Sequence, residues 1–398
     1  DAVLVNGFNT NIPQSFSITN NVLTIVFASA HGFENYSVVK IENADVALYN
    51  REFRVRNVPS TTTIEILVDE TFTTIPTNFI NITIKTAPLG YNKKFESSGK
   101  RIYTSPNWNV AMKVDDYQHA DWNSTWARFA RVQFANDYSD VDTPVGYTYP
   151  NRDLSVITTY AGQTYKYWTH IKLCISRMLG SSEDSTGHVG TNTRAWYIFG
   201  DDKGFYFVHS INNANPTTRT YYHSDYIGTI KPFNTDFIPE NSVYFSGYYN
   251  NSVSNASIIE TNCNDLCRNA SGSIGNYHGL IMNGTSLITW NRLSPMIHPN
   301  TAGGLSGRYI TSSTNPLNSY EYLSQDVLVP IMVDQSKNST YSAIGMSRGI
   351  QGIYTEIMTS RPERNSDYTI KSRIDNSCLM YITNNQDGII AVDIIKDW

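Results

Sequence analysis

The sequence predicts an all-β protein in two parts, and three observations support that class. Runs that alternate apolar and polar residues, the pattern of half-buried strands, recur along the 398 residues, whereas helical spacing is hard to find. Asp-Gly and Asn-rich turns separate these runs. Charged residues make up 16% and aromatic residues 13%, led by 27 tyrosines, which suits strands better than solvated helices. We expect a small N-terminal β-barrel or sandwich, followed by a larger multi-stranded antiparallel β-sandwich or barrel domain.

The first part is expected at residues 1–88, where short strands follow one another at intervals of about ten residues, as in small barrels. Pro88 and Gly90 then interrupt the pattern, so a domain boundary is predicted there. The predicted strands are Asn21–Ala28, Val38–Glu42, Glu52–Asn57, Thr63–Val68 and Phe79–Lys85.

A His-Gly pair, His31-Gly32, comes shortly after the first apolar run. A histidine at the end of a strand is either a candidate catalytic base or part of a turn. Because Gly32 permits the positive φ that a tight turn requires, we interpret His31 as a turn residue.

The second part, residues 89–398, continues in strands, as one large all-β domain or a divisible one. Two hairpins are explicit, with tips at Gly200–Gly204 and Asn384–Gly388, because Asp, Asn and Gly tolerate the positive φ of tight turns. The predicted strands are Asn109–Val114, Ala127–Ala135, Tyr167–Cys174, Arg194–Phe199, Gly204–His209, Asn241–Ser246, Gly279–Met282, Ser286–Trp290, Val327–Val333, Ile350–Ile357, Ser377–Thr383 and Ile389–Ile395.

Charge and composition exclude several classes of function. The formal net charge of -5 argues against a nucleic-acid binder, which needs a concentrated basic face. No apolar stretch of about 18 residues occurs, so we expect no membrane insertion. No phosphate-binding loop occurs and we expect no cofactor. The four cysteines are too few for a disulfide scaffold; Cys263 and Cys267 form a local disulfide, stay as thiols or, with His278, offer three metal ligands.

Three acidic clusters are the candidates for catalysis, since glycoside hydrolysis needs two carboxylates that face one bond. They fall at predicted strand ends and hairpin tips, where Asp favours turns. The segment Gly303–Gly307 is a near match to a serine nucleophile elbow, but out of register. Calcium binding is the other alternative, but the spacing of Asp137–Asp142 lacks the Gly and the distal Glu of a calcium loop. We therefore expect turn residues, no catalytic residue, no metal site and no enzymatic activity. The clusters are Asp115-Asp116, Asp137 with Asp140 and Asp142, and Asp201-Asp202.

Aromatic residues beside polar loops are the remaining candidates for a functional surface. Exposed Tyr and Trp form protein interfaces and also stack on sugars, while a tyrosine-rich core is the alternative. The candidate interface or recognition residues are Tyr147, Tyr149, Tyr165, Tyr167, Trp168, Tyr221, Tyr222, Tyr248 and Tyr249.

Short motifs of the first part occur in a characteristic order: His31-Gly32-Phe33, Val38-Val39, Asn50–Val55 and Thr61–Thr63. In this order they resemble the small β-barrel modules common in structural proteins of tailed bacteriophages. In such modules the His-Gly pair is a turn element. Arg51 stands where those modules usually carry Gly, so the turn at Asn50 is expected to differ.

Motifs of the second part also follow one another in order: Val114-Asp115-Asp116, Trp196 with Asp201, Arg348-Gly349 with Gly352 and Tyr354, and Asp393-Ile394 with Trp398. They are similar to a family of phage and prophage virion proteins. The resemblance covers nearly the whole chain and implies a component of the tail, baseplate or fibre apparatus, without supplying an activity.

The resemblance implies a structural component of the virion, assembled in the bacterial host cytoplasm and acting through protein–protein contacts. Its expected partners are other virion proteins and copies of itself, as a homo-oligomer or ring, because virion organelles are symmetric. A host-surface receptor-binding module that recognises glycans through aromatic loops is the alternative. A polysaccharide-degrading enzyme is the third hypothesis.

Overall fold

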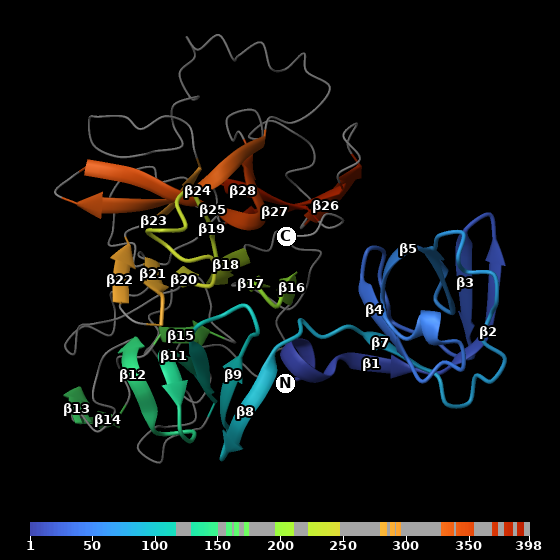
Figure 1. Ribbon diagram of the computed structural model, residues 1–398, viewed down its shortest axis with the longest axis horizontal. Helices are drawn as coiled ribbons and strands as arrows, with labels where there is room; N and C mark the ends of the chain where they lie inside the picture. Colours follow the sequence, from blue (N-terminus) through green and yellow to red (C-terminus); the bar gives the residue numbers. More distant parts are fainter. Residues whose placement is uncertain are drawn as a thin grey trace, which may run out of the picture. The chain divides into compact units, whose positions relative to one another are not determined.

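The computed structural model describes most of the first part and the strands of the second (Figure 1). The described residues are 1–116, 129–149, 157–160, 163–166, 171–174, 196–210, 222–246, 279–284, 287–290, 292–295, 328–337, 340–353, 368–372, 378–384 and 388–393. The chain divides into two compact units, Asp1–Asn92 and Lys93–Trp398.

Both units are built from strands, which confirms the all-β prediction. In the described part of the chain, helical structure is confined to a short π-helix, η1 (Ala2–Asn6), and a 3-10 turn, η2 (Ala47–Tyr49). The sheets pair their strands antiparallel apart from one contact between β18 and β27 in the second unit.

The first unit is a closed barrel. Its seven strands are β1 (Phe8–Asn11), β2 (Pro13–Thr19), β3 (Val22–Phe27), β4 (Val38–Glu42), β5 (Glu52–Ser60), β6 (Thr63–Leu67) and β7 (Thr83–Thr86), hydrogen-bonded in the order β1-β7-β4-β5-β6-β3-β2. The two ends of this order, β1 and β2, are successive pieces of one extended stretch that bends at Ile12. One bent stretch therefore pairs with both sides of the sheet and closes it (Figure 1).

Alternation along the strands fills the barrel. In β3, Leu23, Ile25 and Phe27 are buried and their neighbours are not, as expected for a strand with one face toward a core. Strands β2 to β7 all contribute to one apolar cluster, whose buried members are Phe16, Leu23, Ile25, Phe27, Phe33, Val39, Ile41, Tyr49, Phe53, Val55, Ile64, Ile66, Val68, Phe72, Ile82 and Ile84.

Most predicted strands of this unit are present, within a few residues of their predicted ends. Strands β1 and β2 were not predicted. Their sequence contains Pro13 and two asparagines, of which Asn9 has a φ of 55°. Proline and positive-φ residues are typical of turns, so local pattern favours a loop here. These strands exist because tertiary pairing with β7 and β3 outweighs that preference.

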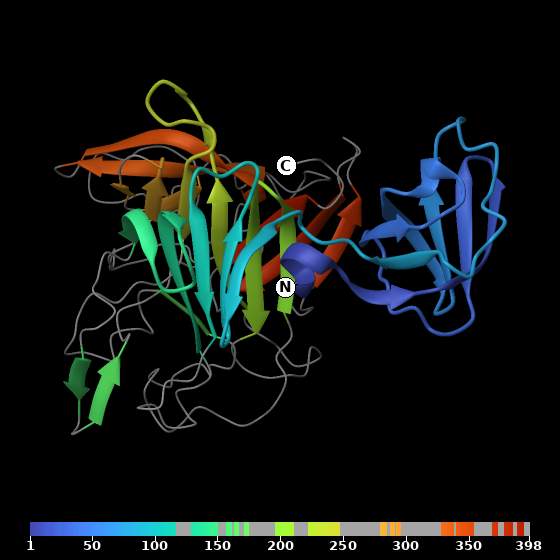
Figure 2. The same ribbon diagram turned by 60° about the horizontal axis from the view of Figure 1, so that its bottom comes forward.

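The second unit contains a six-stranded sheet, whose strands Figure 2 shows side by side from cyan to green. It orders β12 (Pro144–Tyr149), β11 (Phe129–Tyr138), β10 (Ala111–Asp115), β9 (Lys100–Thr104) and β8 (Asn92–Ser97), and β15 (Ile171–Cys174) also pairs with β11. A separate hairpin joins β13 (Ile157–Tyr160) to β14 (Gln163–Lys166).

A thirteen-stranded sheet forms the rest of the described second unit. Its main order is β22-β21-β20-β18-β27-β28-β25-β24-β23, with β16 and β17 beside β18, β19 beside β25 and β26 beside β27. The strands are β16 (Trp196–Asp201), β17 (Gly204–Ser210), β18 (Tyr222–Thr229), β19 (Lys231–Pro232), β20 (Val243–Ser246), β21 (Gly279–Met282), β22 (Leu287–Trp290), β23 (Arg292–Pro295), β24 (Leu328–Lys337), β25 (Thr340–Ile353), β26 (Tyr368–Ser372), β27 (Cys378–Asn384) and β28 (Gly388–Asp393).

Both predicted hairpins of this unit are present. Asp201 pairs with Gly204 across the β16–β17 tip, and Asn384 pairs with Gly388 between β27 and β28. Some of the tyrosines lie in the core, which is the alternative to a functional surface that the sequence left open. Tyr206, Tyr226 and Tyr244 on neighbouring strands are each fully buried.

Candidate functional site

The predicted aromatic candidates with described positions lie in three different sheets. Tyr147 and Tyr149 belong to β12, Tyr165 belongs to β14 and Tyr222 belongs to β18. Of these, Tyr147 has a described side chain, which is 55% exposed. The other five candidates, Tyr167, Trp168, Tyr221, Tyr248 and Tyr249, lie outside the described residues.

Strand β12 forms one edge of the six-stranded sheet and exposes apolar side chains. Val145 is 47% exposed and Tyr147 is 55% exposed. Val145 pairs with Asp137, and a β-bulge follows it, with Gly146 and Tyr147 opposite Asn136. At this bulge Gly146 has a φ of 76° and Tyr147 N donates to Asn136 Oδ1 at 3.0 Å. Within the described residues β12 pairs with β11 alone, so this edge combines strand hydrogen-bonding groups with exposed apolar surface.

The opposite edge, β8, is charged instead. Lys93 pairs with Glu96 on the strand itself, and Arg101 Nη2 lies 2.9 Å from Glu96 Oε1. Lys94 Nζ lies 2.6 Å from Asp137 Oδ1. Charged side chains on an edge strand oppose pairing with another chain, since the charges would have to be desolvated. The two edges of one sheet therefore differ in chemistry.

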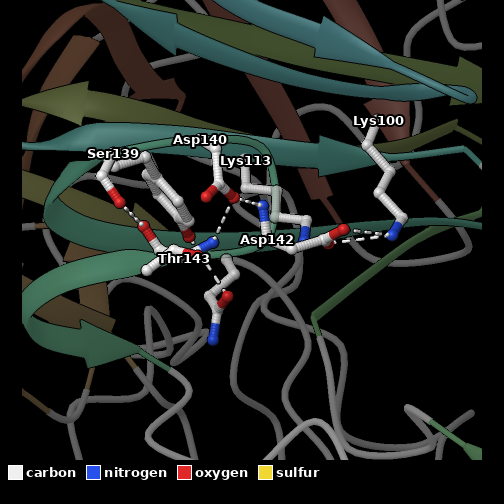
Figure 3. A network of polar contacts seen from close by, with 8 residues as sticks. Lys100, Lys113, Ser139, Asp140, Asp142 and Thr143 are labelled. Atoms are coloured by element: carbon white, nitrogen blue, oxygen red, sulfur yellow. Dashed lines mark hydrogen bonds and ion pairs between the residues drawn. The ribbon is translucent and has the colours of Figure 1, made fainter.

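The acidic residues near the β11–β12 turn form a polar network (Figure 3). Lys100 Nζ donates to Asp142 Oδ1 and Oδ2, both at 2.8 Å, and Lys113 Nζ donates to Asp142 Oδ1 at 2.9 Å. Burial raises the pKa of Asp142, but the hydrogen bonds from Lys100 and Lys113 outweigh it, so the pKa is lowered overall. The Lys113 side chain is only 4% exposed, so Asp142 compensates a nearly buried ammonium.

Asp140 shapes the turn that carries this network. Its Oδ1 accepts hydrogen bonds from Asp142 N at 2.7 Å and Thr143 N at 2.9 Å. These backbone donors lower the pKa of Asp140, since they stabilise the ionised carboxylate. Burial raises the pKa of Asp137, but the hydrogen bond and charge of Lys94 outweigh it, so this pKa is lowered overall. The described geometry gives all three carboxylates structural roles: Asp140 in the turn, Asp137 and Asp142 in ion pairs.

The acidic pair at the β16–β17 tip, Asp201 and Asp202, lies in a different environment from the carboxylates near the β11–β12 turn. Asp201 Oδ1 accepts from Lys203 N at 2.8 Å and from Gly204 N at 3.3 Å, as in an Asx turn. Burial and then the charge of Asp201 raise the pKa of Asp202. Trp108 Nε1 donates to Lys203 O at 2.9 Å and so fixes the tip against the β9–β10 segment.

Two basic residues near this tip were not selected as site residues from the sequence. They are Lys231 on β19 and Arg348 on β25, of which Arg348 entered only as part of a family motif. No sequence spacing links them, because 117 positions separate them and β19 is two residues long. Their proximity arises from sheet pairing alone.

The described part of the chain contains no candidate metal site and no candidate membrane-spanning helix. No group of three His, Cys, Asp or Glu residues there could hold a metal ion. None of its helices is long and apolar enough to cross a membrane. Cys263, Cys267 and His278, and the segment Gly303–Gly307, lie outside the described residues.

Comparisons with known proteins place the chain in no family. No family model matches it, and no curated protein matches it. Among solved structures it aligns with the phage phi92 endosialidase at 11% identity, over 98% of this chain and 70% of that chain, with a TM-score of 0.17. So low a score supports no conclusion about fold or function.

Proposed function

We propose that the chain is a structural component of a tailed-phage virion, in the tail, baseplate or fibre region, that acts through protein–protein contacts. The virion setting is what the sequence motifs imply, and the protein–protein contacts are supported by the unequal chemistry of the two edges of the six-stranded sheet. Edge β8 carries Lys93, Lys94 and Glu96, whereas edge β12 exposes Val145 and Tyr147.

An exposed edge strand offers backbone N–H and C=O groups to another chain. Apolar side chains beside that edge add area that is removed from water on association, at about 25 cal/mol per Å². Tyrosine suits this role because its ring packs while its hydroxyl stays hydrated. The occupant that the proposal commits to is a second copy of this chain.

The test places charge on this edge. Replacing Val145 and Tyr147 together by Lys should shift the chain toward monomer in light scattering coupled to size-exclusion chromatography, since two ammonium groups would have to be desolvated on pairing. The matched control replaces Gln14 and Ser17, exposed residues on barrel strand β2, by Lys. The control should keep the wild-type mass. Equal masses for both double variants, or a wild-type chain that stays monomeric at high concentration, would refute the proposal.

The host-surface hypothesis ranks second. Tyr147, as an exposed ring, supports a protein interface and a sugar-stacking surface equally. A screen of the whole chain against bacterial surface glycans separates the two functions, because an assembly protein has no need of glycan affinity. A polysaccharide-degrading activity ranks third, since Asp137, Asp140 and Asp142 are engaged by lysines or by the turn.

A further inference from the structure

Lys231 and Arg348 lie close together in the large sheet. Strand β19 pairs antiparallel with β25, with Lys231 opposite Met346 and Pro232 opposite Gly345. Arg348 is two residues beyond Met346, and its Nε donates to Oγ1 of Thr229, which lies two residues before Lys231. The strands can approach this closely because position 345 is glycine: a Cβ there would lie 2.6 Å from Lys231 O. The Arg348 guanidinium also reaches Ile230 O, the carbonyl just before Lys231, so the two cations are near neighbours.

Neutral groups hold the guanidinium of Arg348 in place. Its Nε donates to Thr229 Oγ1 at 2.9 Å and its Nη2 donates to Ile230 O at 3.2 Å. Thr229 and Ile230 are each 1% exposed, so this anchor is rigid. Among the described residues neither Arg348 nor Lys231 forms an ion pair with a carboxylate. Within the described residues, the contacts that position the Arg348 guanidinium are thus made to neutral groups.

The surroundings of Lys231 destabilise its protonated, positively charged form. Burial lowers the pKa of Lys231, and the charges of Arg348 and Lys203 lower it further, while Asp201 acts in the opposite direction. Clustered like charges that weaken one another are typical of sites that bind an oppositely charged ligand. An anionic group that met both Lys231 and Arg348 would relieve this repulsion.

Hydrogen-bond acceptors lie beside these cations. Thr229 N donates to Lys203 O at 2.8 Å, which brings the β16–β17 tip with Asp201 and Asp202 next to the Arg348 anchor. These carboxylates would repel a densely charged ligand such as a nucleic acid or an acidic peptide. They accept hydrogen bonds well from hydroxyl groups. A ligand with one anionic group and several hydroxyls fits this mixture.

We propose that Arg348 and Lys231 bind the carboxylate of an acidic saccharide, whose hydroxyl groups are accepted by the acidic tip of the β16–β17 hairpin. Planar guanidinium groups match carboxylates in geometry, and charge-assisted hydrogen bonds are the stronger kind. The site lies in the thirteen-stranded sheet and does not involve β12, so it stands independently of the assembly function.

Isothermal titration calorimetry on the whole chain tests the site, with tetragalacturonate as the probe. The fully methyl-esterified tetramer is the matched neutral ligand, because it keeps every hydroxyl and loses only the charges. We expect the ester to bind at least about tenfold more weakly, since hydrogen bonds between charged groups are the main contribution. Lys231→Gln should weaken tetragalacturonate binding to a similar extent, and Lys231→Arg should retain it.

Lys40→Gln on barrel strand β4 is the control, because it changes the net charge equally and lies in the other unit. It should bind tetragalacturonate as the wild type does. Arg348→Lys tests the second cation, with its thermal unfolding recorded to separate lost binding from lost folding. Four results would each overturn the proposal: no binding, equal binding of the ester, equal loss in the Lys40 and Lys231 variants, or equally tight binding of inorganic phosphate or a tetraglutamate peptide.

Discussion

His31 shows how far a single residue can be interpreted from sequence. Its ring is 1% exposed, its Nδ1 accepts from Phe33 N at 2.9 Å and its Nε2 lies 3.2 Å from Ser60 O. Accepting at Nδ1 fixes the neutral tautomer with the hydrogen on Nε2, which then donates to Ser60. Gly32, with a φ of 68°, indicated the turn correctly. The partner at Ser60 lies 29 residues away and carries no local signal.

The candidate sites show the same limit. Turn chemistry placed Asp140 and Asp201 correctly, because an Asp side chain bonds backbone groups two or three residues on. Nothing in the sequence pairs Asp142 with Lys113, 29 positions away, or Lys231 with Arg348. Those contacts depend on strand register across a sheet, which local periodicity does not encode.

Asp142 should make the stability of the second unit depend on acid pH. Because its folded pKa is lowered, its contribution is fully present above the ordinary Asp value of about 3.9 and is lost as the pH falls through the folded pKa. Its side chain is 54% exposed, so solvent screening limits the effect to about 1 kcal/mol. Urea unfolding at pH 7 and pH 3 should show a smaller loss for Asp142→Asn than for the wild type. Glu240→Gln, at an exposed position, should lose stability as the wild type does.

The β16–β17 hairpin illustrates what sequence reveals about an element. Its tip and pairing were predicted from alternating aromatic residues around Asp201 and Gly204, and both are present. The order of strands in the sheets was not predictable, since β1 pairs with β7 and β18 pairs with β27 across long stretches of chain. Such pairings depend on which apolar faces must be buried together, a property of the whole sheet.

Glycines set the distance between β17 and β18 at this hairpin. A Cβ at Gly228 would lie 2.3 Å from Gly204 Cα and 2.8 Å from Lys203 O. These are backbone atoms that cannot rotate away, so Gly228→Ala should destabilise the unit by about 2–3 kcal/mol. Thr235→Ala, at an exposed loop position, serves as the control. Differential scanning calorimetry should show a lower unfolding temperature for Gly228→Ala alone, and equal temperatures would contradict the close approach.

At the scale of the molecule, the two compact units have separate cores. The buried cluster of the barrel draws on residues 16–84 only. The boundary between units falls after Asn92, whereas Pro88 and Gly90 predicted it after residue 88. That the two units are independently folding domains stays a prediction, and the few residues between these two boundaries give a direct way to test it.

Residues 1–92 should fold alone, and should be more stable than residues 1–88. Leu89 N donates to Val3 O at 2.9 Å and Tyr91 N donates to Leu4 O at 3.0 Å, so the additional segment ties down the N-terminal turn. These two hydrogen bonds should contribute about 1–3 kcal/mol to the free energy of unfolding. Dispersed amide resonances for the 1–92 fragment, and a higher midpoint in urea than for the 1–88 fragment, are the expected results. Collapsed resonances for 1–92 would show that the barrel needs the rest of the chain, and equal midpoints would show that the segment 89–92 only connects the two units.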